Sequence, residues 1–150
     1  MNNFDQSSVS EYLRFIGEQN LTESQELDLK LFALACAERV LPIFEKQYPS
    51  DSSVSDCIEK TRIYLAGGCT LDELKEYACA AKFAAYAATS VADAAATAAY
   101  AATDAVDAAA YAAYAVVVAN TAHAAYNDNY TAERETQHNE LLKLVTKWGW

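Results

Sequence analysis

The sequence predicts an all-α fold, a single compact bundle of about six helices with an alanine-rich C-terminal half. Alanine, which has the highest helix propensity, supplies 31 of the 150 residues. Only four Gly and two Pro leave little material for the many tight turns of an all-β domain. Polar residues of the second half recur at steps of three and four, the spacing of one helix face. The length is that of one domain, so we expect residues 1–150 to fold as a unit.

The N-terminal part contains the start signal of a long helix. Residues 1–8 are polar, and we expect them to be disordered, with a short helix around 12–16 to follow. Thr22 and Gln25 have the spacing of a capping box, in which each side chain bonds the other residue's backbone N–H. The helix that begins there carries a wide apolar surface, which predicts burial on most sides. Pro42 lies inside it and removes one backbone hydrogen bond.

The middle of the chain contains a turn and two further helix boundaries. Residues 48–53 (YPSDSS) combine proline with small polar residues, which is typical of a turn before a helix. The helix after this turn is expected to stop at residues 67–68, because paired glycines tolerate the left-handed conformation that ends many helices. Thr70 and Glu73 repeat the capping-box spacing and predict the start of the alanine-rich half.

The alanine-rich tract is too long to be one helix in a compact domain. Residues 78–125 include 26 alanines among 48 residues. A continuous helix over residues 71–126 would be about 84 Å long, several times the radius of gyration of a compact chain of this size, which is about 15 Å. We expect a break near residues 89–90, and residues 103–104 are a second candidate. The cluster at 127–129 (NDN) is typical of a loop, with a last helix over about 133–147.

One face of the tract carries all four tyrosines and all three aspartates between residues 86 and 121. Two interpretations are open: the face is exposed while alanines pack against neighbouring helices, or its tyrosines and aspartates form a buried network. Buried aspartates without cationic partners are unfavourable. No Lys or Arg occurs between Phe83 and Ala132, so we favour the exposed face. Its members are Tyr86, Ser90, Asp93, Thr97, Tyr100, Asp104, Asp107, Tyr111, Tyr114, Val118 and Thr121.

This face supplies the candidate partner-binding residues. Tyrosine provides a large contact area at low entropic cost, and aspartate pairs with basic groups. A charged helix face is also commonly a solvated surface with no partner. The candidates are Asp93, Tyr100, Asp104, Asp107, Tyr111 and Tyr114.

The net charge restricts the classes of partner. The chain has 21 acidic and 11 basic residues, a formal charge of −10. This field disfavours nucleic acid and anionic membranes and attracts a basic protein, although acidity also serves solubility alone. The N-terminus lacks the basic and apolar regions of a signal peptide, and no run is apolar enough to predict a membrane span. The four cysteines form no CxxC pair, which favours reduced thiols and a cytoplasmic location.

The sequence shows no recognisable catalytic or cofactor-binding pattern. His123 and His138 are 15 residues apart in different expected elements, so they do not form a helical metal pair. Asp104 and Asp107 are one turn apart, but two carboxylates are too few to define a metal site. We expect neither an enzyme nor a bound cofactor or metal.

Three segments of the chain are similar to a family of bacterial putative immunity proteins. The first is the run from Cys36 to Pro49, CAERVLPIFEKQYP, which is fairly specific. The second is IEKTR at 58–62, and the third is AERETQ at 132–137, which matches in part. The resemblance extends over about residues 27–146. It implies an all-helical protein that neutralises a co-encoded toxin by stoichiometric binding.

The resemblance weakens in the alanine-rich tract. Relatives tend to carry histidines there, whereas residues 103–114 of this chain read TDAVDAAAYAAY. A histidine-dependent site is therefore not expected here. Two other functions remain open from the residues: a small-molecule or metal-binding protein with a pocket around Tyr100, Asp104 and Tyr111, and a self-associating structural module. The oligomeric state and the identity of the toxin are not encoded in any pattern that we find.

Overall fold

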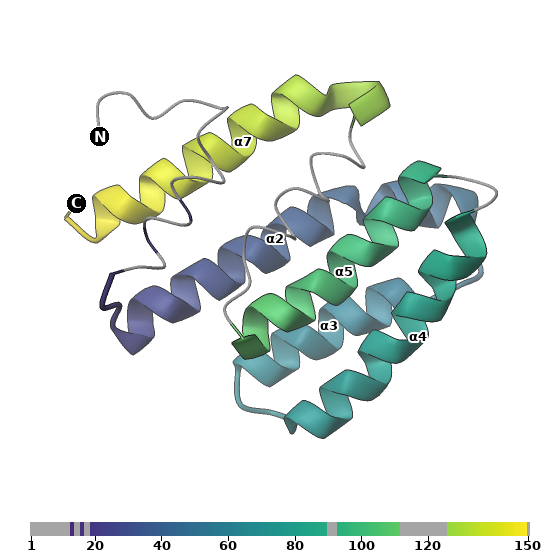
Figure 1. The fold of residues 1–150 in the computed structure, drawn as a ribbon, viewed down its shortest axis with the longest axis horizontal. Coiled ribbons are helices and arrows are strands. Elements are labelled where there is room, and N and C mark those ends of the chain that lie inside the picture. The colour runs from purple at the N-terminus through teal and green to yellow at the C-terminus, as the bar shows by residue number, and fades with distance from the viewer. Residues whose placement is uncertain (1–12, 14–15, 17–18, 90–92, 112–125, 150) are drawn as a thin grey trace.

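The structure is a computed structural model, and it describes residues 13, 16, 19–89, 93–111 and 126–149 (Figure 1). Within these ranges there is no strand, so the predicted all-α bundle is confirmed. The described part holds five long helices where about six were expected. They are α2 (Glu23–Gln47), α3 (Ser53–Leu65), α4 (Leu71–Thr89), α5 (Asp93–Tyr111) and α7 (Tyr126–Lys147).

Helix α2 begins at the capping box that the sequence predicts. The Gln25 backbone N–H donates to Thr22 Oγ1 at 3.1 Å, and the Thr22 N–H donates to Gln25 Oε1 at 2.9 Å. These bonds satisfy backbone donors that have no partner inside the helix. The helix continues through Pro42, which is exposed, and ends where the Tyr48 N–H donates to the Phe44 carbonyl at 2.9 Å. Local sequence signals therefore fix both ends of α2.

Paired glycines end α3, as expected. Gly67 has φ of +82°, a conformation that non-glycine residues rarely adopt. The Gly68 N–H donates to the Ile63 carbonyl at 2.8 Å, and a Cβ on Gly68 would lie 2.8 Å from Ile63 Cγ2. The second capping box then starts α4, because the Glu73 N–H donates to Thr70 Oγ1 at 3.2 Å.

The described part of the alanine-rich tract is divided between two helices. Helix α4 ends at Thr89 and α5 begins at Asp93, which confirms the break expected near 89–90. The second candidate, at 103–104, is wrong because α5 is continuous there. The Thr103 hydroxyl donates to the Tyr100 carbonyl at 2.8 Å inside the helix, and alanines on both sides are buried. Packing of the neighbouring alanines therefore keeps α5 helical at Thr103 and Asp104, where the local sequence favoured a break.

The cluster at 127–129 is helical, so its assignment to a loop is wrong. Helix α7 begins at Tyr126 and contains all three residues in its first turn. The same residue types are typical of loops and of helix starts.

The helices form layers around α2 and α5 (Figure 1). Helix α5 packs against α4, α2 and α3, and α2 lies between α5 and α7. The side of α5 that faces the bundle is made almost wholly of alanine, which lets the helix axes approach closely. Its buried residues are Ala96, Ala98, Ala99, Ala101, Ala102, Ala105, Val106 and Ala109, with Thr97.

Adjacent residues of α2 join it to helices on two sides. Glu38 pairs with Arg62 of α3. Arg39 pairs with Glu133 of α7, with Nη2 to Oε1 at 2.8 Å, and also with Glu140. The Glu133 side chain is only 8% exposed and also accepts a hydrogen bond from Gln137 Nε2 at 3.1 Å. These ion pairs fix α3 and α7 relative to the central helix.

Candidate partner-binding surface

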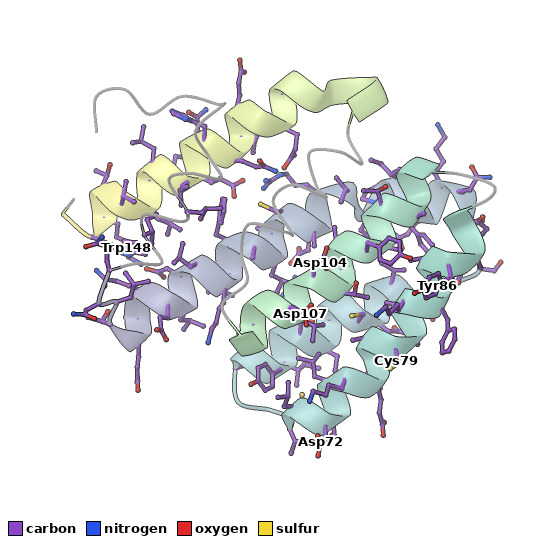
Figure 2. The ribbon with its side chains drawn as sticks, in the orientation of Figure 1. Asp72, Cys79, Tyr86, Asp104, Asp107 and Trp148 are labelled. Carbon is purple, nitrogen blue, oxygen red and sulfur yellow. The ribbon has the colours of Figure 1, made fainter. Side chains whose placement is uncertain are left out.

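The predicted face of α5 is partly exposed, and its exposure changes along the helix. Thr97 is buried at 8% exposure, Tyr100 and Asp104 are half-buried, and Asp107 is exposed. Figure 2 shows the two aspartates on α5 beside α4. The described members of the face are therefore neither a solvated stripe throughout nor an internal network. The accessible portion lies towards the C-terminal half of α5.

The structure places only part of the candidate set. Asp93 is the first residue of α5 and Tyr111 is the last, but their side chains are outside the described part of the chain. Tyr114 lies outside the described residues altogether. Tyr100, Asp104 and Asp107 follow one another at steps of four and three on α5 and so share one face. Of the six candidates, these three have described side chains.

Helix α4 adds aromatic side chains to the same surface. The Tyr86 and Tyr100 rings meet edge to face, with centroids 6.1 Å apart and planes at 87°. This is a favoured geometry for aromatic pairs. Tyr86 remains 61% exposed and Phe83 is 73% exposed. The hairpin of α4 and α5 thus presents aromatic rings next to the carboxylates of α5.

A shallow groove of about 100 Å³ lies on this part of α4. It is lined by Cys79, Lys82, Phe83 and Tyr86, and Figure 2 shows Cys79 and Tyr86 along the helix. These positions share one face of α4. Each of them lies three or four residues from the next one on that face, and Lys82 and Phe83 are neighbours in the chain. Leu74, Ala81, Ala84 and Ala85, which face the bundle, are buried.

The sequence interpretation missed the contribution of α4. It placed Tyr86 on the polar face but did not choose it, and it overlooked Phe83. The available signal was the pair of aromatic residues three apart, opposite a run of alanines that supplies the packed side. Alanines at the interface leave bulky apolar residues with no place inside, so Phe83 and Tyr86 are displaced outwards.

A second groove, of about 450 Å³, lies between α2 and the end of α3. Leu27 and Leu31 of α2 are 40% and 44% exposed in this region, although the sequence predicted burial on most sides of α2. Neither groove is lined by the Tyr100, Asp104 and Tyr111 set of the small-molecule hypothesis. The lining residues of this groove are Glu23, Glu26, Leu27, Lys30, Tyr64, Leu65, Gly67 and Cys69.

The buried thiols are poor nucleophiles. Burial raises the pKa of Cys36 and of Cys57 to about 12, so both are protonated at neutral pH. The Cys57 thiol lies 3.8 Å from the Ala102 carbonyl and links α3 to α5. All four cysteines are free, Cys69 being half-buried and Cys79 exposed.

The described residues lack two further kinds of feature. They contain no group of three or more His, Cys, Asp or Glu side chains placed to hold a metal ion. None of their helices combines the length and the apolar character needed to cross a membrane.

Comparison with known proteins gives one match. A family model described as Imm-5 like putative immunity protein matches residues 19–144. This range includes all three segments on which the sequence resemblance rests. No curated protein and no solved structure matches the chain.

Proposed function

We propose that this chain, which belongs to the Imm-5 like putative immunity protein family, protects the cell that makes it by binding and neutralising a cognate toxin protein. The observation that carries the proposal is the family match, which covers most of the chain. Neutralisation by binding needs a stoichiometric complex and no chemistry of the immunity protein's own. We place the complex in the cytoplasm of the producing cell.

The outer side of the α4–α5 hairpin is the proposed contact surface. It combines the partly or fully exposed Tyr86, Tyr100, Asp104 and Asp107 with the groove on α4. Aromatic residues bury large areas at interfaces, and carboxylates select basic partners. The proposed surface also includes Asp93, Tyr111 and Tyr114, on the sequence argument alone. A net charge of −10 would steer a basic toxin domain towards the molecule.

Binding, rather than catalysis, is the proposed mode of action. Two of the four thiols are buried with raised pKa values, as described above. The partly buried charge cluster at Arg39 joins α2 to α7. Tyr86 and Asp107 are exposed on the hairpin, and their chemistry suits recognition.

The decisive experiment co-expresses the chain with the protein encoded beside its gene and follows growth. We expect the wild-type chain to restore growth and the double variant Asp104→Lys, Asp107→Lys to lose most of that protection. The purified double variant should associate about tenfold more slowly at low salt, because steering by charge acts on the association rate. Circular dichroism should show an unchanged fold, because Asp107 is exposed and Asp104 half-buried.

A charge-matched variant separates the local effect from the net charge. Glu45→Lys with Glu135→Lys changes the net charge by the same amount, at exposed positions of α2 and α7 instead of the hairpin. We expect this variant to bind nearly as well as the wild type. Equal loss in both variants would mean that the hairpin is not the contact surface. Unfolding of the Asp104, Asp107 variant would mean that these residues belong to the core.

A further inference from the structure

The hairpin surface has the chemistry to recognise one kind of side chain. The Tyr86 and Tyr100 rings lie edge to face at 6.1 Å, and Tyr86 keeps 61% of its surface exposed. An edge-to-face pair leaves ring faces uncovered, and those faces carry negative electrostatic potential. A planar cation is the group that stacks best on such a face.

Carboxylates continue from the tyrosine pair along α5. Asp104 is four residues beyond Tyr100 and Asp107 is seven, so they lie about 6 and 10 Å further along the helix axis. Asp107 is exposed and has no ion pair among the described residues. Helix α5 itself contains no Lys or Arg. Aromatic rings and carboxylates therefore lie on one surface, to which α5 contributes no cation, while α4 contributes Lys82 in the groove beside Tyr86.

A different tyrosine of α4 shows this chemistry within the chain. The Lys60 ammonium lies 5.2 Å from the centroid of the Tyr77 ring and also 3.8 Å from a Glu73 carboxylate oxygen. Tyrosine and carboxylate together hold one cation at that site. The Tyr86–Tyr100 pair with Asp104 offers the same combination on the proposed contact surface.

We propose that this surface binds an arginine side chain of the protein partner, stacked on the Tyr86–Tyr100 pair and paired with Asp104, with Asp107 attracting further basic groups. Arginine fits better than lysine, because its flat guanidinium stacks on a ring while its N–H groups reach a carboxylate in the same plane. The proposal deepens the proposed function and rests on it for the identity of the partner as a protein. It names Tyr86, which the sequence did not select, as an anchor.

The test uses short blocked peptides and needs no toxin. The probes are Gly-Arg-Gly, Gly-Lys-Gly and Gly-citrulline-Gly, since citrulline keeps the shape of arginine without its charge. Each is titrated into the full ¹⁵N-labelled chain and followed by nuclear magnetic resonance. We expect the arginine peptide to shift the amides of Tyr86, Tyr100 and Asp104, the lysine peptide to bind more weakly, and the citrulline peptide to cause no change.

Variants locate the binding to the rings. Tyr86→Ala should lower the affinity for the arginine peptide about three- to fivefold, which corresponds to the loss of an exposed cation–aromatic contact. Tyr86→Phe should keep the affinity, because the ring remains. Tyr77→Ala is the matched control, because that ring serves Lys60. Equal binding of the citrulline peptide, or an unchanged affinity in Tyr86→Ala, would overturn the proposal.

The growth assay separates this proposal from the proposed function. Full protection by Tyr86→Ala would overturn the arginine contact and leave toxin neutralisation standing. No protection by the wild-type chain would reject toxin neutralisation, and with it the identity of the partner. The peptide titration would still decide whether the hairpin accepts an arginine side chain.

Discussion

Asp28 fastens the end of α7 to the beginning of α2. Its carboxylate accepts a hydrogen bond from the Trp148 indole N–H at 3.0 Å and bonds from Lys147 Nζ at 3.1 and 3.3 Å. The indole hydrogen bond is the main reason that the pKa of Asp28 lies below its ordinary value of 3.8, and Lys147 lowers it further against the opposing effect of burial. The charged form of Asp28 is thus the form that the folded chain favours.

The sign of the pH dependence follows from that shift. A carboxyl whose pKa is lowered by folding stabilises the fold at pH values above 3.8, and the contribution is lost as pH falls through the lowered pKa. In a Trp150→Phe background, Trp148 fluorescence should therefore change with a midpoint below pH 3.8. Asp28→Asn should abolish this transition. A midpoint at or above 3.8, or the same transition in Asp28→Asn, would contradict the assignment.

At the scale of one element, the main feature of α5 is that the side chains on its packed face are small. It contacts α4, α2 and α3, and alanines supply most of the buried positions. Close helix packing of this kind has no space for a longer side chain. The helix therefore survives the polar Thr103-Asp104 pair, because packing along its length outweighs the local preference for a break.

Enlarging one of these alanines should destabilise the fold. Ala99 is fully buried, and Ala99→Leu is expected to lower the free energy of unfolding by about 1–3 kcal/mol through overpacking. The melting temperature should fall by about 2–10 °C. Ala87 is exposed on α4, and Ala87→Leu should change the free energy by no more than about 0.5 kcal/mol. Similar melting temperatures for both variants would show that α5 is loosely packed.

At the scale of the whole molecule, the three segments that carry the family resemblance meet at α2. Glu38 and Arg39 of the first segment pair with Arg62 of the second and Glu133 of the third. Arg39 and Glu133 are 94 residues apart in the chain. The signature residues thus hold α3 and α7 in place, on a different part of the molecule from the proposed contact surface.

The two arginines should differ in their effect on stability. Arg39→Ala leaves the Glu133 carboxylate buried without its cation, and we expect a loss of about 3 kcal/mol, at the lower end for a broken buried pair because Arg39 is 26% exposed. Arg62 and its partners are 41–61% exposed, so Arg62→Ala should lose less than about 1 kcal/mol. Urea denaturation followed by circular dichroism measures both. Equal losses would mean that the Arg39 cluster is effectively solvated.

Local signals in the sequence predict the boundaries of α2, α3 and α4, because caps and paired glycines act within a few residues. The all-α class and the break after Thr89 follow equally from composition and spacing. Contacts between distant residues were not predictable: nothing local indicates that Arg39 meets Glu133, or that Tyr86 meets Tyr100. The candidate surface was accordingly found on one helix, although it is built from two.

The position of Arg39 and Glu38 has a consequence for how such proteins diversify. The signature residues Glu38 and Arg39 join helices, so we expect them to be kept when specificity changes. The outer side of the α4–α5 hairpin takes no part in these ion pairs. Its exposed side chains lie next to alanines, so we expect substitutions there to be tolerated. We therefore expect chains with the same signature to differ in the toxin they recognise, and grafting hairpin side chains between them to transfer cross-protection.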